Sequence, residues 1–562
     1  MDRKTLYVSS QRLWATTDGG QTWRALSGDL TRHDPSTMGP SGGPITGDMN
    51  GPEVYGVIFS VAPGKRDARV IWTGSDDGLV HVTRDGGRTW TNVTPPDMPA
   101  FGRVSQIDAS PFESGAAYIS VRRPLLDDLA PYIFRTADYG RTWTRITNGI
   151  RSDDYVHAVR ADPTRRGLLY AATQHGVYLS YDDGVRWQSL SLNLPDVPVA
   201  DLVVEKNELV IATHGRGFWV LDDVAALRQA TPAVLASAGH LFTPPSGVRS
   251  GPGVVLSWWL SKAPTTARLE IVDSAGMVVR TFEPDTAKAD STRGDSTRTD
   301  STRTDSAGAG TAKPDSARAD TTARPAGGRN RGTFLPMGAG INRLVWDLRA
   351  QGITQFPKMI LWGAGTNGPA VPPGRYTVRL VADGRTLTAP VTVTRNPWLT
   401  ATDADLRAQY TFSRRVRDRV NEANQAVIDI RRVKAQLDDR LTRSKDSTLA
   451  ARGATLRTNA TAVEESVYQV RNQSNQDPLN FPIKVNNRLA TLMSMAERGD
   501  GAPTTNMPEI FGILSTELGG YLTRLGVVWQ TDLAATNVEL RRLGLPVLDP
   551  ACAEVKGCVP RM

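Results

Sequence analysis

Adjacent aspartates recur in the first half of the chain, at residues 76–77, 127–128 and 153–154. Two carboxyl groups that face each other across a cleft, about 6.5–9.5 Å apart, can hydrolyse a glycosidic bond with inversion, one acting as acid and the other as base. Aspartates also cap turns, so a structural role is the alternative for each of them. The candidate catalytic residues are Asp76, Asp77, Asp127 and Asp128, with Asp153 and Asp154 as further partners.

Arginine, tyrosine and histidine side chains accompany these acids in the same stretches of sequence. Their types suit contact with a glycan or a peptide, because they combine hydrogen-bond donors with flat apolar rings. The candidate ligand-binding residues are Arg12, Tyr55, Arg103, Arg122, Asp154, Tyr155, His157, His175, His214 and Arg216.

The candidate residues do not indicate metal or cofactor chemistry. His157, His175 and His214 lack a carboxylate-rich frame, so we predict no metal site. A Gly-rich phosphate loop and a Gly-x-Ser-x-Gly elbow are both absent from the sequence, which argues against nucleotide and serine-hydrolase chemistry. We expect no cofactor.

The candidate residues are embedded in a repeat. Four copies of the octapeptide Ser/Thr-x-Asp-x-Gly-x-x-Trp begin at Thr16, Thr83, Thr136 and Ser180. The pattern describes a self-contained turn: Asp accepts hydrogen bonds from nearby amides, Gly adopts a positive φ, and Trp packs the hairpin onto its neighbour. We predict structural roles for Asp18, Trp23, Asp85, Trp90, Asp138, Trp143, Asp182 and Trp187.

Short β-rich runs recur around the octapeptides in one order. In one unit the runs 54–63, 68–75, 78–87 and 88–93 indicate four antiparallel strands, with the octapeptide at the turn between the third and the fourth. Four-stranded units at roughly 45–65 residue spacing are typical of propeller blades. Residues 1–225 are therefore expected to form a partial β-propeller of about 4–5 blades.

The array is incomplete at both ends. The unit nearest Met1 lacks a first strand, and the unit at 199–223 lacks a fourth. The two ends could complete one blade together, or missing upstream blades or a second chain could complete the propeller. We favour the interpretation that this chain is the C-terminal part of a longer protein.

The pattern changes from about Gly251. Alternating strands at 240–284 and 332–396 predict a β-sandwich of the immunoglobulin or fibronectin kind. Between them, residues 285–331 are a low-complexity run without large apolar side chains, for which we expect disorder. Thr402 and Asp405 form a capping-box pattern that opens a helical region, and 400–545 is predicted to be an antiparallel bundle with 546–562 as a tail.

The bulk composition excludes some classes of protein. The net charge is +8, but Lys and Arg are spread along the chain among the acids, so we expect no nucleic-acid partner. Apolar runs are too short for a membrane span. Cys552 and Cys558 are the two cysteines, and they either close a small disulfide loop in an exported protein or stay reduced.

The octapeptides and strand order resemble Asp-box (BNR) repeat proteins, and most closely the bacterial group related to sortilin that is often labelled glycosyl hydrolase. The resemblance rests on residues 54–63, 72–96, 131–146 and 212–223, and it extends to LRRLGLPVLDP at 540–550. It implies an exported protein, extracellular or periplasmic. The arginine triad of sialidases finds no match here, so sialidase activity is not implied.

Two functions follow from this reading. In a propeller, the loops that carry the candidate residues emerge on the face opposite the octapeptide turns, where ligands usually bind. The first hypothesis is an exported propeller that binds a glycan, peptide or protein partner on this face. The alternative is a glycoside hydrolase that acts through a pair of aspartates there.

Overall fold

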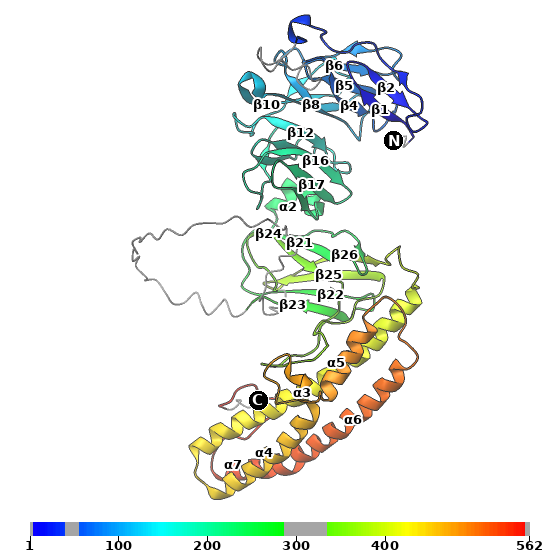
Figure 1. Ribbon diagram of the computed structural model, residues 1–562. Coiled ribbons are helices and arrows are strands. Elements are labelled where there is room, and N and C mark those ends of the chain that lie inside the picture. The colour runs from blue at the N-terminus through cyan, green and yellow to red at the C-terminus, as the bar shows by residue number, and fades with distance from the viewer. Residues whose placement is uncertain (1–3, 40–54, 286–333, 557–562) are drawn as a thin grey trace, which may run out of the picture. The chain divides into compact units, whose positions relative to one another are not determined.

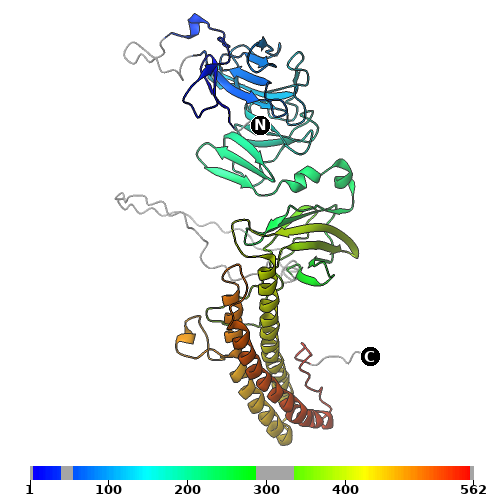
Figure 2. The same ribbon diagram turned by 90° about the vertical axis from the view of Figure 1, so that its right-hand side faces the viewer.

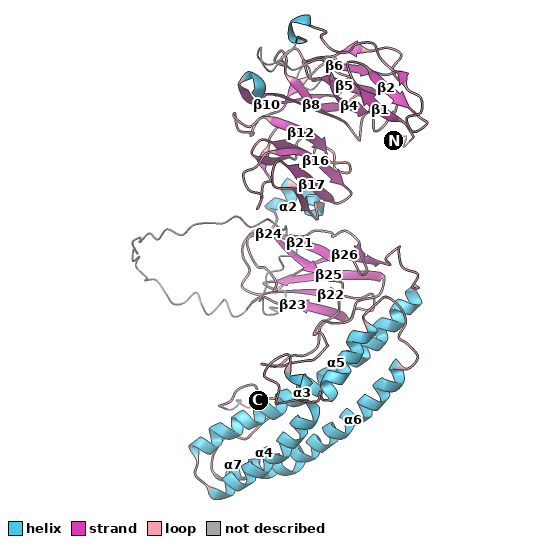
Figure 3. Ribbon diagram, viewed as in Figure 1, coloured by secondary structure: helices cyan, strands magenta, loops and turns pink. Residues whose placement is uncertain are grey.

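The computed structural model describes residues 4–39, 55–285 and 334–556. The protein consists mainly of β-sheets and has a C-terminal helical region (Figures 1 and 3). The chain divides into two compact units, Met1–Ala230 and Thr231–Met562. No helix in the described ranges is long and apolar enough to cross a membrane.

The first unit contains five antiparallel sheets that follow one another along the chain. The first and the last have three strands, and the three between them have four. The strands are β1 (Leu6–Ser9), β2 (Leu13–Thr16) and β3 (Arg24–Ala25); β4 (Ile58–Pro63), β5 (Ile71–Ser75), β6 (Val80–Thr83) and β7 (Thr91–Asn92); β8 (Arg103–Ala109), β9 (Ala117–Arg123), β10 (Asp128–Thr136) and β11 (Thr144–Arg145); β12 (Val156–Ala161), β13 (Leu169–Thr173), β14 (Gly176–Ser180) and β15 (Gln188–Ser189); and β16 (Val199–Glu205), β17 (Glu208–Thr213) and β18 (Phe218–Leu221). The short helix α1 (Ala225–Gln229) closes the unit.

Apolar side chains fill the space between each sheet and the next. Leu13 of the first sheet packs with Ile71 of the second, and Trp72 of the second packs with Ile119 of the third. The third and fourth sheets, and then the fourth and fifth, are joined by similar buried clusters. Strands β13 and β14 are buried along their whole length, because both faces of their sheet are covered. Within the described residues, the two three-stranded sheets do not pair with each other.

Each octapeptide forms the turn between the last two strands of its sheet, which are β2 and β3 in the first sheet and the third and fourth strands in the next three. In the Thr136–Trp143 turn, Asp138 accepts hydrogen bonds from the Thr142 amide (2.9 Å) and from both hydroxyls of Thr136 and Thr142. The bonds from Thr142 lower the pKa of Asp138 to about 2. Asp18 and Asp85 make the same three bonds, whereas Asp182 makes two, because Arg186 takes the place of the second threonine in its turn. The conserved-spacing glycines Gly20, Gly87, Gly140 and Gly184 have φ values between 79° and 95°, as the turn requires.

The tryptophan of the octapeptide joins neighbouring sheets. The indole Nε1 of Trp90, Trp143 and Trp187 donates to a backbone carbonyl of the preceding sheet, at Leu26 (2.9 Å), Val93 (2.7 Å) and Ile146 (2.8 Å) respectively. Trp23 belongs to the first sheet and remains substantially exposed. The prediction that each tryptophan packs onto a neighbouring unit is therefore wrong for Trp23 within the described residues.

The second unit begins with α2 (Pro232–Ala236) and two packed sheets. One sheet has the order β19 (Gly239–Leu241), β21 (Val254–Leu260), β24 (Gly340–Trp346). The other has the order β20 (Gly247–Val248), β26 (Arg385–Thr394), β25 (Gly374–Ala382), β22 (Ala267–Val272), β23 (Val278–Phe282). The predicted disorder at 285–331 falls almost wholly outside the described residues.

The helical region contains α3 (Asp403–Arg443), α4 (Ser447–Val467), α5 (Val485–Ala496), α6 (Met507–Val528), a π-helical turn (Trp529–Leu533) and α7 (Ala534–Arg542). Figure 2 shows the long helices running side by side. Thr402 and Asp405 cap α3 reciprocally, which confirms the predicted capping box. Leucine, valine and alanine side chains of the facing helix surfaces form one buried core. Cys552 is disulfide-bonded, and its predicted partner Cys558 lies outside the described residues.

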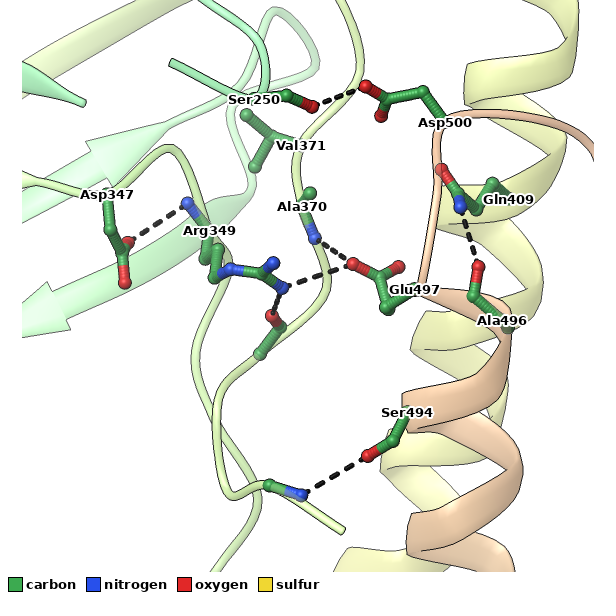
Figure 4. A network of polar contacts seen from close by, with 12 residues as sticks. Ser250, Asp347, Arg349, Ala370, Val371, Gln409, Ser494, Ala496, Glu497 and Asp500 are labelled. Atoms are coloured by element: carbon green, nitrogen blue, oxygen red, sulfur yellow. Dashed lines mark hydrogen bonds and ion pairs between the residues drawn. The ribbon is translucent and has the colours of Figure 1, made fainter. Parts of the chain in front are cut away.

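A buried polar network joins the sheets of the second unit to its helices (Figure 4). Arg249 is almost fully buried and is paired with Asp500, and its guanidinium also donates to Gln409 Oε1 (2.8 Å). Arg349 donates to Glu497 (3.1 Å), which also accepts the Ala370 amide (2.9 Å). Because each guanidinium has a carboxylate partner, these charges are compensated inside the protein.

The β24–β25 loop, residues 347–373, lies on the helices, and its backbone is hydrogen-bonded to their side chains. Its Thr354 amide donates to Asn421 Oδ1 (2.7 Å), and the Thr354 carbonyl accepts from Asn424 Nδ2 (2.7 Å). The amides of Ile360 and Trp362 donate to Tyr468 and Asn487. Irregular backbone near a core must find such partners, since an unpaired buried amide is costly.

Candidate functional site

The first unit carries a cavity of about 350 Å³ at one end of its sheets. Strands β8 and β12 begin there, β9 ends there, and the segment before β4 contributes one wall. Because β8 and β9 are antiparallel, the start of one and the end of the other meet at the same edge. The strand-end pocket is lined by Tyr55, Phe101, Arg103, Arg122, Arg123, Pro124, Leu125, Leu126 and Tyr155.

Arg103 and Arg122 are direct cross-strand partners in the β8–β9 ladder. Like charges in this arrangement repel each other and destabilise a sheet. Burial, and then the charge of Arg103, lower the pKa of Arg122. Among the described residues, neither arginine has a carboxylate within ion-pair distance. The pocket therefore holds two neighbouring positive charges without an ion pair among the described residues, and the buried carboxylate of Asp76 acts on Arg103 only from a longer distance.

His157 supports Arg122 from the adjacent sheet. Arg122 Nη1 lies 2.9 Å from His157 Nδ1, and because arginine only donates, this nitrogen must accept. The imidazole is thus neutral, and burial together with Arg122 lowers the pKa of His157 to about 4. Its Nε2 faces Gln174 Oε1 at 3.4 Å.

Aromatic rings line the pocket beside the two arginines, and the guanidinium of Arg103 lies over the ring of Phe59 at 4.8 Å. The rings of Tyr55 and Phe101 lie 5.6 Å apart, and the guanidinium of Arg32 covers Phe101 at 5.0 Å. On the other side, the ring of Tyr155 lies 5.1 Å from that of His157, which in turn lies 6.2 Å from His214. Aromatic rings beside partly buried cations offer flat apolar contact next to a site for negative charge.

Arg123 differs from its two neighbours because it has an acidic partner. Its Nη1 donates to Asp128 Oδ2 at 2.9 Å, and the same oxygen accepts the Tyr132 hydroxyl at 3.0 Å. Asp128 is therefore engaged at the rim of the strand-end pocket. Asp127 is exposed, with a φ of 55°, at the end of the short 3-10 turn Pro124–Leu126.

Asp76 and Asp77 are buried. Asp76 Oδ1 accepts the amides of Gly56 and Val57, both at 3.0 Å, and burial raises the pKa of Asp76. Asp77 accepts the Arg32 amide at 2.8 Å and the Ser75 hydroxyl. Each carboxylate thus holds a loop in place, and neither lines the strand-end pocket.

The remaining predicted residues are dispersed. Asp154 is buried against the His175 amide (3.0 Å) and the Tyr178 hydroxyl (3.1 Å), while Asp153 pairs with Arg151 at the surface. His175 faces Asp196 at 2.8 Å. Arg12 and Arg216 are exposed in the β1–β2 and β17–β18 turns. Four of the ten predicted ligand-binding residues line the pocket, namely Tyr55, Arg103, Arg122 and Tyr155.

Sequence reasoning missed Phe101 and the apolar wall of Pro124, Leu125 and Leu126. A signal for Phe101 was present, because Tyr55, Phe101 and Tyr155 each stand just before the first strand of three consecutive sheets. Nothing comparable marks the two leucines, which are exposed in the short 3-10 turn Pro124–Leu126. Within the described ranges, no group of three or more His, Cys, Asp or Glu side chains is placed to hold a metal ion.

Comparison with known proteins gives no family assignment. No family model and no curated protein matches the chain. Among solved structures, an ancestral GH74 enzyme shares 14% identity at a TM-score of 0.31, over 50% of this chain and 36% of its own. YCF48 bound to D1 peptide shares 20% identity at 0.22, over 40% and 75%. An extracellular domain of a two component system from B. thetaiotaomicron shares 12% identity at 0.28, over 46% and 32%.

The chain thus spans about a third of the length of the GH74 enzyme and of the extracellular domain. Likeness at these TM-scores transfers neither an activity nor a ligand to this chain. The assignment of function therefore depends on the strand-end pocket itself.

Proposed function

We propose that the five sheets of the first unit are blades of a partial Asp-box propeller in an exported protein, and that the strand-end pocket binds a glycan, peptide or protein partner. The single observation that carries this proposal is the Arg103–Arg122 pair, which is cross-strand, partly buried and without a carboxylate partner in the described structure. Uncompensated charge of this kind is costly to a fold, and perturbed groups in a pocket are typical of functional sites.

The Arg103–Arg122 pair also indicates which chemical group the ligand should carry. Two guanidinium groups beside aromatic rings favour a negatively charged group, a carboxylate above all, because guanidinium binds it with two parallel hydrogen bonds. Tyr55 and Tyr155 on the two sides would stack on the adjacent ring or apolar part of the ligand. The bound anion would relieve the repulsion between the two arginines.

Recognition is better supported than hydrolysis. A glycosidase of the inverting type needs two free carboxyl groups across the cleft. Asp76 and Asp77 are occupied by backbone amides, and Asp128 is paired with Arg123. Hydrolysis by paired aspartates stays a prediction, and it is tested below with Asp128→Asn.

Binding to glycan and peptide arrays, followed by calorimetric titration of the positives, tests the proposal. Each array should contain neutral and carboxylate-bearing members. We expect binding of carboxylate-bearing ligands that is lost in Arg103→Met and Arg122→Met and kept in Arg66→Met, a matched exposed arginine at the opposite end of its sheet. Equal binding by wild type and the three variants would show that the ligand binds outside the strand-end pocket. Binding of neutral ligands alone would show that the arginine pair does not recognise the ligand.

A further inference from the structure

The strand-end pocket is poor in side-chain hydrogen-bond acceptors. Its lining, within the described residues, consists of three arginines, three aromatic rings, one proline and two leucines. In this set only the hydroxyl oxygens of Tyr55 and Tyr155 can accept a hydrogen bond. A sugar ring presents several hydroxyl donors, and each donor that is buried without an acceptor costs free energy. The lining therefore suits a ligand with one strong acceptor group and few donors.

The apolar wall of the pocket is open to solvent. Leu125 is 79% exposed and Leu126 is 44% exposed, although both line the cavity. They belong to the 3-10 turn Pro124–Leu126, in which no residue is buried, so they contribute little to the core of the first unit. Exposed apolar side chains that gather beside a cavity are typical of a surface that a ligand or partner covers.

A second apolar surface lies beside Arg103. The guanidinium of Arg103 lies over the ring of Phe59 at 4.8 Å, and Phe59 is itself exposed on β4. Stacking on a ring uses the flat face of a guanidinium and leaves its in-plane N–H donors available to an anion. The two arginines are thus bordered by aromatic rings at Arg103 and by leucines beyond Arg122.

Charge and apolar contact come from neighbouring residues, since Arg122 and the two leucines fall within residues 122–126. A matching ligand must therefore carry a carboxylate and an apolar group close together on one side. Successive side chains of an extended peptide point to opposite faces, so an internal acidic residue and its apolar neighbour point apart. The last residue of a peptide differs, because its carboxylate and its side chain are attached to the same carbon atom.

We propose that the strand-end pocket binds the carboxyl terminus of a peptide or protein whose last residue is apolar. The terminal carboxylate binds Arg103 and Arg122, and the terminal side chain packs against Leu125 and Leu126. This inference rests on the proposed function, because the same arginine pair holds the carboxylate in both. Capture of a terminal carboxylate is an established mode of peptide recognition, and it selects chain ends over the same residues within a chain.

Fluorescence anisotropy with hexapeptides labelled at the N-terminus tests this inference on the full chain. The peptides share a glycine–serine body and end in leucine or in serine, each as the free acid and as the amide. We expect the leucine-ended acid to bind most tightly. Its amide should bind at least about tenfold more weakly, because the charge-assisted hydrogen bonds are lost. The serine-ended acid should bind about tenfold more weakly, because an apolar side chain is no longer buried.

Variants of the apolar wall separate the two contacts. Leu125→Ser combined with Leu126→Ser should lower the affinity for the leucine-ended acid to that for the serine-ended acid, and both leucines are exposed, so the fold should tolerate the change. Val185→Ser, at an exposed apolar position in the octapeptide turn of the fourth sheet, should bind like wild type. Arg122→Met should lose binding of both acids.

Two further probes distinguish a failure of this inference from a failure of the proposed function. These are an amidated hexapeptide with an internal glutamate and an oligogalacturonate. If either binds more tightly than the leucine-ended acid and is lost in Arg122→Met, the inference is overturned while the role of the arginine pair stands. Equal binding of acid and amide also overturns it. If no carboxylate-bearing probe binds, or if Arg122→Met binds as wild type does, the proposed function fails as well.

Discussion

Arginine has opposite surroundings in two regions of this molecule. In the second unit, Arg249 and Arg349 are held by Asp500 and Glu497, and the charges hold sheets and helices together. In the first unit, Arg103 and Arg122 face each other across a ladder, and neither forms an ion pair among the described residues. Burial alone therefore does not separate structural from functional charges. The presence of a partner does, because a fold that bears an uncompensated charge gains nothing from it unless a ligand compensates it.

The largest expected effect comes from breaking the compensated pair. Arg249→Met leaves the carboxylate of Asp500 nearly buried and unpaired, so the second unit should lose about 3–5 kcal/mol of stability. Denaturant unfolding monitored by helical circular dichroism measures this loss. Arg249→Met combined with Asp500→Leu should recover much of it, and the exposed Arg452→Ala on α4 should change little. An unfolding free energy that is unchanged in Arg249→Met would show that the Arg249–Asp500 pair does not stabilise the second unit.

Removing the charge of Arg122 should weaken ligand binding without lowering the stability of the protein. Arg122→Met should weaken ligand binding by about 1.5–3 kcal/mol, or roughly 10- to 100-fold, because a charge-assisted hydrogen bond is lost. Its stability should be unchanged or higher, since the repulsion with Arg103 disappears. Calorimetric titration and thermal unfolding of the same samples check both quantities. A variant that loses stability as well as binding would show that Arg122 is structural.

The histidine beside Arg122 should give a smaller, pH-dependent effect. The pKa of His157 is about 4 in the folded protein, below its ordinary value, so the unfolded chain takes up the proton first as the pH falls. The stabilising contribution is therefore complete above about pH 6.5 and is lost progressively toward pH 4, by up to about 1 kcal/mol at pH 5.5. Denaturant midpoints of wild type and His157→Gln at pH 7.5 and 5.5 measure it. Equal pH dependence in the two proteins would refute it.

The smallest expected effect concerns catalysis. Asp128 is paired with Arg123 and bonded to Tyr132, which suits a positioning residue at the pocket rim. A polysaccharide hydrolysis screen should release no sugar with wild type, Asp77→Asn or Asp128→Asn. Sugar release by wild type that vanishes in Asp128→Asn would revive the hydrolase hypothesis and locate one of its acids.

Local signals in the sequence predicted those elements whose causes are themselves local. The octapeptide turns and the cap of α3 are determined by residues at most a few positions apart, so their spacing identifies them. The sheets of the first unit also follow the predicted strand order. Trp23 was an exception because its packing depends on a neighbouring sheet and not on its own turn.

The pocket could be predicted only in part, because its geometry depends on register and loop conformation. A bulge between Val104 and Gln106 shifts the β8–β9 ladder, and it is the resulting register that brings Arg103 opposite Arg122. Spacing in the sequence does not reveal such an insertion. Asp76 and Asp77 looked available for chemistry, yet distant backbone amides at residues 32, 56 and 57 occupy their oxygens.

The β24–β25 loop has a consequence for the order in which the second unit is made. This loop leaves the ribosome before α3 and α5, whose asparagines supply the hydrogen bonds of its Thr354 and Trp362. Synthesis proceeds from the N-terminus. The backbone amides and carbonyls of this loop therefore lack their side-chain hydrogen-bond partners until the helices emerge. The sheets and helices of the second unit are therefore expected to mature as one body, late in translation, and a chain that stops short of α5 should be a target for quality-control proteases.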